Sequence, residues 1–219
     1  MEAKQLFDGV FKIEGKLATR NLVPGNRVYG EELININGVE YRTWNPYRSK
    51  LAAAILKGLK ELRIRPGSTV LYLGAATGTT CSHVSDIIGK EGLVYCVEIS
   101  ERSMRDLVLV CDKRQNMLPI LQDAMNIEAY AKEVGKVDVI YQDVSSRMQA
   151  EILLRNASLL KQGGYAYVAI KSQSISSSKN PKEVFSEFLG KIKRSFETVE
   201  SIDISPYSLL HLFAVLRKR

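Results

Sequence analysis

One segment constrains the fold of this chain more than any other, the run VLYLGAATG at residues 70–78. Residues 70–73 are apolar strand formers, and Gly74 and Gly78 let the backbone turn sharply and approach a ligand closely, with Ala75 between them. The residues that follow, Thr79 to Ile88, are compatible with a helix. This order of strand, glycine loop and helix is typical of nucleotide-binding α/β folds.

A carboxylate follows at the position where such a fold needs one. Glu98 ends the next apolar run, LVYCVE, twenty residues after Gly78. A carboxylate at the carboxyl end of the second strand can accept hydrogen bonds from two ribose hydroxyls. A structural turn would explain the two glycines alone, but together with Glu98 they predict a site for an adenosine-bearing cofactor.

Length and composition permit one compact catalytic domain with an extension. The chain has 219 residues, of which 45% are hydrophobic and 25% charged, so it is long enough to form a large core. No run approaches eighteen apolar residues, and the first sixteen residues lack the apolar stretch of a signal peptide. We therefore expect a cytoplasmic protein with no membrane partner.

The three cysteines are odd in number and far apart in the sequence. Cys81, Cys96 and Cys111 each lie among core-type residues, which disfavours a disulfide framework or a zinc site. We interpret them as small buried hydrophobic residues and expect no metal.

Positive charge is concentrated in two stretches. The net charge is +7, and residues 48–65 and 171–194 each contain six cations against one or two acidic residues. Such stretches are typical of a phosphate-facing surface. The alternative is that these lysines and arginines only solvate helix faces.

The first part of the chain predicts a small antiparallel β domain, residues 1–47. Short alternating segments are separated by Pro24-Gly25-Asn26 and Asn37-Gly38, which are hairpin signals. The predicted strands are residues 9–13, 16–21, 27–29, 33–36 and 39–44. A helix at Ser49 to Leu62 then leads into a Rossmann-like domain, residues 48–219.

The second part alternates strands and helices, which predicts a parallel sheet with helices on both faces. The last two apolar runs, residues 197–204 and 210–216, are too close for an intervening helix and predict a final antiparallel hairpin. That ending favours the seven-stranded methyltransferase form of the α/β fold over a dinucleotide dehydrogenase. The expected strands are residues 69–73, 93–98, 118–122, 137–142 and 165–171, and the expected helices are 79–88, 103–114, 127–134, 148–160 and 181–195.

Polar residues end several of these strands, where open α/β sheets bind ligands. Asp123 is placed to accept a hydrogen bond from an adenine amino group, unless it only caps a turn or helix. Asp143 ends the buried-type strand 137–142 and points to the switch point of the sheet, unless it caps the helix near Met148.

Lys171 is the most informative single residue. It ends the buried-type strand 165–170 next to the strand of Asp143, where burial lowers the pKa of a lysine and a carboxylate raises it. Such a lysine can hold or deprotonate a hydroxyl nucleophile, although a lysine that only extends from the strand end to solvent is the alternative. His83 is interpreted as a packing and hydrogen-bonding residue.

Five segments together resemble fibrillarin, the guide-RNA-directed ribose 2'-O-methyltransferase family. They are WNPYRSKLAAAIL (44–56), VLYLGAATGTTCSHVSDIIG (70–89), GLVYCVEIS (92–100), VDVIYQDV (137–144) and AIKSQSIS (169–176). The resemblance implies S-adenosylmethionine as cofactor and no metal. It also implies a box C/D ribonucleoprotein that acts on rRNA and tRNA, with a guide RNA, a Nop-family scaffold and a kink-turn-binding ribosomal-type protein.

The same resemblance implies the site residues. Lys50, Asp143, Lys171 and His211 match the catalytic tetrad, in which Lys171 is the favoured base, Lys50 holds a backbone phosphate and His211 completes the hydrogen-bond frame. The cofactor-binding positions are Gly74, Ala75, Thr79, Thr80, Glu98, Ile99, Asp123, Ala124, Asp143, Val144, Ser145, Ser146 and Gln149.

One loop departs from the family pattern. Where the family has Ala-Gln-Pro-Asp-Gln, this chain reads Ser145-Ser146-Arg147-Met148-Gln149, so that Ser146 replaces a glutamine of the cofactor pocket. A catalytically weak or inactive RNA-binding scaffold is therefore one alternative function. A nicotinamide-dependent oxidoreductase is another, but residues 74–78 lack its Gly-x-Gly-x-x-Gly pattern.

Overall fold

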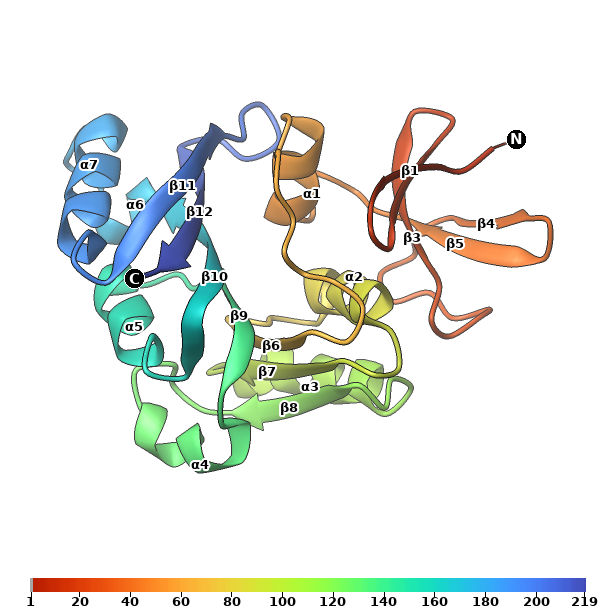
Figure 1. Ribbon diagram of the computed structural model, residues 1–219, viewed down its shortest axis with the longest axis horizontal. Helices are drawn as coiled ribbons and strands as arrows, with labels where there is room; N and C mark the ends of the chain where they lie inside the picture. Colours follow the sequence, from red (N-terminus) through yellow and green to blue (C-terminus); the bar gives the residue numbers. More distant parts are fainter. Residues whose placement is uncertain (1) are drawn as a thin grey trace.

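The computed structural model describes residues 2–219 and contains two sheets, with helix α1 lying between them (Figure 1). The smaller sheet is antiparallel with strand order β1-β2-β3-β5-β4. Its strands are β1 (Lys4–Phe7), β2 (Val10–Ile13), β3 (Lys16–Arg20), β4 (Leu33–Ile36) and β5 (Val39–Thr43).

Two predictions for this sheet were wrong. Residues 27–29 form no strand, because Val28 and Tyr29 donate their backbone amides to the Glu31 carboxylate and the Tyr29 hydroxyl lies 2.7 Å from His83. The first strand, β1, was missed because its side chains are mostly exposed and show no alternation of burial. A strand without a buried face carries no period-2 signal.

Helix α1 (Lys50–Leu56) is half as long as predicted. The Ser49 side chain caps its amino end, and Gly58 adopts a φ of 94° just after its carboxyl end. This left-handed conformation ends the helix, so that Leu59 and Leu62 reach the core from an extended segment. Five successive α1 residues are buried, because the two sheets cover the helix from different sides (Figure 1).

The larger sheet has strand order β11-β12-β10-β9-β6-β7-β8, in which β12 is antiparallel to both neighbours and the other six strands run in one direction. The predicted final hairpin is confirmed. The order in which successive strands are added to the sheet reverses between β6 and β9, which are parallel neighbours. The strands are β6 (Thr69–Leu73), β7 (Leu93–Glu98), β8 (Met117–Leu121), β9 (Val137–Gln142), β10 (Leu160–Lys171), β11 (Phe196–Asp203) and β12 (His211–Lys218).

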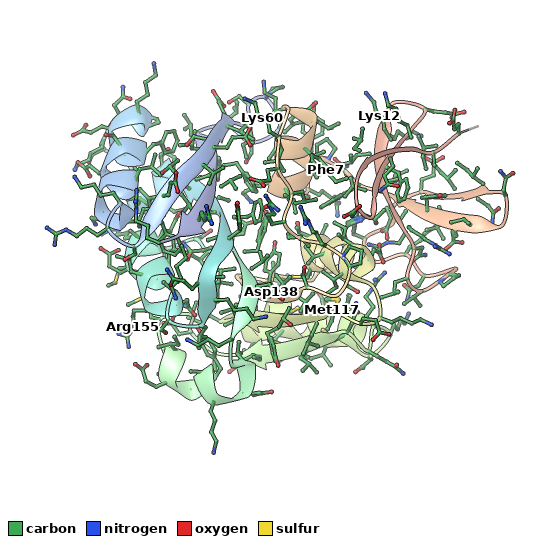
Figure 2. The ribbon with its side chains drawn as sticks, in the orientation of Figure 1. Phe7, Lys12, Lys60, Met117, Asp138 and Arg155 are labelled. Carbon is green, nitrogen blue, oxygen red and sulfur yellow. The ribbon has the colours of Figure 1, made fainter. Side chains whose placement is uncertain are left out.

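Helices cover both faces of this sheet, as predicted, because alternate strand residues point to opposite sides. On one face, Tyr72 and Tyr141 pack in the same core as α1, α2 (Thr79–Ile88) and α3 (Glu101–Cys111). On the other, Leu71 and Ile140 pack with the second group of helices, and side chains fill the space between the elements (Figure 2). That group comprises η1 (Ile127–Ala129), α4 (Ala131–Val134), α5 (Gln149–Asn156) and α7 (Pro181–Ile192).

The observed helix bounds differ from the predicted ones by a few residues. A short helix α6 (Ser172–Ile175) directly after β10 was not predicted. The three cysteines are buried, as predicted. None of the helices formed by residues 2–219 has the length and apolar character needed to span a bilayer.

Candidate active site

A cavity of about 620 Å³ opens at the carboxyl ends of β6, β7 and β9, next to the point where the strand order reverses. It is lined by Lys50 and Lys171 and by all predicted cofactor-binding residues except Gln149. The fold thus brings together residues that are up to 121 positions apart in the sequence. Residues whose lining role was not predicted include Arg48, Tyr72, Met125, Met148 and Ile152.

The glycine loop folds back onto Glu98. Gly74, Ala76 and Gly78 all have positive φ values, of 83°, 48° and 88°. This path points the Ala76 amide at Glu98 Oε2 (2.7 Å), while Oε1 accepts from the Ser100 amide (2.8 Å). Each carboxylate oxygen keeps a second lone pair, so the 8% exposed Glu98 is fixed in place and still able to accept from a ligand.

Gly74 is required where the two central strands end. A Cβ atom on Gly74 would lie 2.9 Å from the Asp143 carbonyl oxygen and 3.1 Å from the Val144 amide nitrogen. No side chain fits in this contact, so the glycine loop lies directly against the strand end that carries Asp143.

Beyond Glu98 the cavity wall is apolar and partly open. Ile99 is 64% exposed although it is a large hydrophobic residue, and it lines the cavity together with Ala124, Met125 and Val144. Asp123 lines the same region, with its Oδ1 accepting from the Met125 amide at 2.8 Å. An apolar surface with a free acceptor at its edge suits a flat heterocycle that carries an amino group.

The cavity is also lined by one carboxylate that lies between two ammonium groups. Lys50 Nζ lies 3.0 Å from both Asp143 oxygens, and Lys171 Nζ lies 2.8 Å from Oδ1. Asp143 therefore forms an ion-paired cluster, while α5 begins at Gln149 without a side-chain cap. All three side chains are at most 22% exposed, which strengthens their mutual attraction.

Lys171 Nζ donates to the Asp143 carbonyl oxygen (2.7 Å) and to Ser145 Oγ (3.1 Å), in addition to its ion pair with Asp143 Oδ1. Burial lowers the pKa of Lys171 and the Asp143 carboxylate raises it, with burial the larger effect.

His211 starts β12 directly opposite Lys171 in the antiparallel pair β10–β12. It is partly buried and does not line the cavity wall itself. Its Nδ1 lies 2.6 Å from the Leu209 carbonyl oxygen. Burial lowers the pKa of His211 below the usual 6.5, and the nearby Lys50 and Lys171 charges add to this effect.

The residues of the loop that differs from the family pattern, 145–149, lie in different surroundings. Ser145 contacts Lys171, and Ser146 lines the cavity and accepts from the Met148 amide. Gln149 is fully buried and is not among the residues that line the cavity; its Oε1 accepts from the Lys171 backbone amide and its carbonyl accepts from the Gln142 side chain. Through these contacts Gln149 supports the strand that carries Lys171, and its predicted role in cofactor binding stays a prediction.

The basic stretches are partly neutralised. Lys179 pairs with Glu187, and Lys191 pairs with Glu151. In the first stretch, Arg63 stacks over the Tyr165 ring at 5.2 Å, while Arg48 and Lys50 reach the cavity. Positive charge at the site therefore comes mainly from the start of α1 and from Lys171.

His83 does not line the cavity. His83 is buried, stacks on Trp44 at 4.7 Å and contacts the Thr19 and Tyr29 hydroxyls, as predicted for a packing residue. Within residues 2–219, the His, Cys, Asp and Glu side chains form no group of three or more that could hold a metal ion.

The residues present fit S-adenosylmethionine. Glu98 offers free lone pairs for a ribose, Ile99 and its apolar neighbours offer a surface for adenine, and Gly74 allows close approach of the ligand to the backbone. The Lys50–Asp143–Lys171 cluster lines the same cavity and can contact the hydroxyl of a methyl acceptor.

Comparison with known proteins agrees with this geometry. A family model described as Fibrillarin matches residues 1–219. The chain is 52% identical to the "Fibrillarin-like rRNA/tRNA 2'-O-methyltransferase" of Thermococcus gammatolerans, over 98% of each chain.

Two solved structures are also similar. Aeropyrum pernix fibrillarin, crystallised with natively bound S-adenosyl-L-methionine, matches with a TM-score of 0.91 and 44% identity over 99% of this chain and 98% of that chain. A fibrillarin in complex with Nop5p matches with a TM-score of 0.90 and 38% identity over 99% of this chain and 100% of that chain. The match over the full length, at this level of identity, shows that the chain belongs to the fibrillarin family.

Proposed function

We propose that this chain is an S-adenosylmethionine-dependent RNA ribose 2'-O-methyltransferase that acts on rRNA and tRNA. The observation that carries this proposal is one cavity lined both by Glu98 with the glycine loop and by the Lys50–Asp143–Lys171 cluster. Glu98 and the glycine loop suit an adenosine, and the cluster suits a hydroxyl that must be oriented and lose its proton. The names of the relatives give the same activity.

The chain's own residues perform the binding and the alignment. When bound, S-adenosylmethionine supplies a methyl group that its positive sulfur already activates. Glu98 and the glycine loop hold the adenosine, which fixes the direction from which the methyl group is offered. Asp143 and Lys171 hold the ribose hydroxyl in line with that direction, and such alignment accounts for much of the rate of a two-reactant step.

The 2'-hydroxyl itself selects RNA over DNA, because it is both the nucleophile and a group that DNA lacks. Lys50 and Arg48 line the same opening and supply positive charge for the phosphates that flank the target ribose. We propose that the sequence of the target is selected from outside this chain.

We further propose that this selection comes from a box C/D guide RNA, within a complex that also contains a Nop-family scaffold and a kink-turn-binding protein. The structure of a fibrillarin with Nop5p supports the Nop-family partner. Base pairing with a guide would then choose the nucleotide, and the chain would supply the chemistry.

Reconstitution tests this proposal. The chain should bind S-adenosylmethionine in calorimetry, methylate free RNA poorly, and methylate one nucleotide once the Nop-family protein, the kink-turn-binding protein and a guide RNA are added. A target with a single 2'-deoxy nucleotide at that position is the matched control and should not react. Binding of a nicotinamide dinucleotide, or of no cofactor, would instead favour the oxidoreductase or the inactive scaffold.

A further inference from the structure

A second hollow, of about 230 Å³, lies at the turn between helices α6 and α7, outside the cofactor cavity. Its polar lining combines one guanidinium group, one side-chain amide and three hydroxyl groups, and none of the described residues that line it is a carboxylate. The lining residues are Arg147, Gln173, Ile175, Ser176, Ser177 and Ser178. A positive charge surrounded by N–H and O–H donors suits an anion that has several oxygen atoms.

Arg147 is available to bind such an anion. Its side chain is exposed. Two carboxylates lie near it, Glu151 and Glu187, but each is already paired with a lysine. In the part of the chain that the structure describes, no carboxylate forms an ion pair with Arg147. The planar guanidinium can therefore donate two parallel hydrogen bonds to a phosphate group, which is the arrangement that arginine favours.

The turn after α6 offers further donors. Among residues 2–219, the backbone amides of Ser177 and Ser178 have no hydrogen-bond acceptor, and their side chains are exposed. The Ser176 hydroxyl accepts from the Lys179 amide at 3.3 Å, which keeps it within the turn. Arginine, serine and glutamine side chains together with backbone amides are the groups that proteins use to contact nucleic-acid phosphates. The hollow thus has the composition of a phosphate site.

The hollow borders the cofactor cavity. Ser146 and Met148 line the cavity, whereas Arg147, which lies between them in the sequence, lines the hollow. On the other side, Gln173 of the hollow follows Lys171 of the cavity by two residues. A phosphate in the hollow therefore belongs to a nucleotide close to the one whose ribose enters the cavity.

Arg147 is also specific to this sequence. It lies in the loop that differs from the family pattern, at the position where that pattern has proline. Proline has no charge and no N–H group, so it cannot hold a phosphate. The change in the loop thus adds a cation beside the active site.

We propose that Arg147, Gln173 and the turn at residues 176–178 bind one backbone phosphate of the target RNA, next to the nucleotide that is methylated. This inference rests on the proposed function and gives it a second binding site. The phosphate comes from the target strand, because the hollow adjoins the cavity that the target ribose enters. The contact fixes the register of the strand and carries no sequence information, as is usual for phosphate contacts.

Binding of target RNA to the reconstituted guide complex, without S-adenosylmethionine, tests this site without any methyl transfer. Arg147→Ala should bind the target about tenfold more weakly at low salt. The slope of log affinity against log salt should also become shallower by about 0.7–0.9, as expected for the loss of one phosphate contact. Equal affinity and equal slope for the parent and Arg147→Ala would overturn the proposal.

Arg155→Ala is the matched control for the loss of charge. Arg155 is an exposed arginine of α5 that pairs with Glu128 and does not line the hollow. Its removal changes the net charge by the same amount, so affinity and slope should stay near those of the parent. A loss as large as that in Arg147→Ala would mean that general charge, and not a phosphate site, accounts for the effect.

Neutral methylphosphonate linkages identify the phosphate. One linkage at a time is replaced on both sides of the target nucleotide, and the sugar before it carries a 2'-O-methyl group that keeps the linkage stable. One position in the target strand should weaken binding to the parent about tenfold but have little effect on binding to Arg147→Ala. The proposal is rejected if no position depends on Arg147, or if the position that does lies in the guide strand.

Cofactor binding separates this proposal from the proposed function. Arg147→Ala should bind S-adenosylmethionine like the parent in calorimetry, because Arg147 does not line the cofactor cavity. A loss of cofactor affinity would assign Arg147 to the cofactor site and reject a separate phosphate site. If the parent complex bound the target but transferred no methyl group, the proposed function would fail, while an Arg147-dependent phosphate contact would still be measured as binding.

Discussion

The Asp143 side chain joins two elements at the reaction site, because one carboxylate holds the ammonium group of Lys50 from α1 and that of Lys171 from β10. Without it, two cations would face each other in a partly buried site, which is unfavourable. The distances within this cluster fix the position of Lys171, and with it the position of any oxygen that Lys171 contacts.

Glu98→Ala should weaken S-adenosylmethionine binding by about thirtyfold, or ~2 kcal/mol, because ribose hydroxyls and two backbone amides would lose their acceptor. Titration calorimetry measures the change. Glu101→Ala is the matched control, since Glu101 is an exposed carboxylate three residues away that does not line the cavity. Equal affinity for the parent and Glu98→Ala would remove Glu98 from the cofactor site.

Lys171→Ala should lose methyl transfer by a factor on the order of a hundred, because the hydroxyl loses its positioning donor. Cofactor affinity should remain near that of the parent, since Lys171 Nζ donates to the Asp143 carbonyl oxygen and to Ser145, whereas the ribose of the cofactor is assigned to Glu98. Lys161→Ala is the control on the same strand: Lys161 pairs with Asp138, labelled in Figure 2 beside β9. A variant that folds but loses cofactor binding would make Lys171 a cofactor ligand instead.

At the scale of elements, the site depends on how closely the loop after β6 approaches the end of β9. The strand order reverses between these two strands, so the connections that follow them run to opposite sides. Their carboxyl ends therefore leave an opening that helices do not fill. Gly74 allows the approach because it has no side chain and adopts a φ of 83°.

Gly74→Ala should destabilise the fold by about 2–5 kcal/mol, from the positive φ and from overlap of the new methyl group with the backbone of Asp143 and Val144. Gly38→Ala has a similar φ of 81° but open space around it, so it should lose only about 1–2 kcal/mol. Urea unfolding compares the two. Equal losses would mean that β6 and β9 can separate without penalty.

At the scale of the whole molecule, a buried charge cluster joins the smaller sheet to helix α2, which packs on the larger sheet. Arg42 on β5 contacts Glu31 and Asp86, and Asp86 on α2 also contacts Arg114. These four side chains are at most 1% exposed. Packing continues around them, because Val10, Leu17 and Trp44 of the amino-terminal region share one core with α1 and α2.

Asp86→Asn should therefore destabilise the entire chain, by about 3–5 kcal/mol, because buried Arg114 would lose the carboxylate that it contacts and buried Arg42 would lose one of its two. Calorimetry should show a single unfolding transition at lower temperature. Glu32→Gln breaks the exposed pair with Lys16 in the same region and should change stability by less than about 1 kcal/mol. Two separate transitions in the parent would show that the sheets unfold independently.

His83 predicts a pH dependence of stability. Its pKa in the folded chain lies well below 6.5, because of burial and the nearby Arg42 and Arg114 charges. Below pH 6.5 the unfolded chain therefore binds a proton that the folded chain refuses, and stability falls by up to about 1.4 kcal/mol per pH unit. The slope between pH 6.5 and 5 should be smaller in His83→Gln, and an equal slope would contradict a neutral buried His83.

Local patterns in the sequence determined the larger sheet, its final hairpin and the cofactor loop. Each of these depends on neighbours in the chain: apolar runs specify strands, Gly74 and Gly78 specify the turn, and Glu98 follows at a fixed distance along the next strand. Because the carboxyl ends of parallel strands meet at one edge, a list of strand ends also predicted which polar residues would meet.

Only the tertiary structure decided the contacts between distant segments. Gln149 Oε1 accepts from the Lys171 backbone amide, Ser145 Oγ accepts from Lys171 Nζ, and the Leu209 carbonyl oxygen contacts His211 Nδ1. Helix α1 ends before the predicted residue, and β1 forms at an exposed edge of the smaller sheet. Neither the end of α1 nor the formation of β1 is specified by a periodic apolar pattern. Such contacts depend on distance and direction in space, and residue order alone specifies neither.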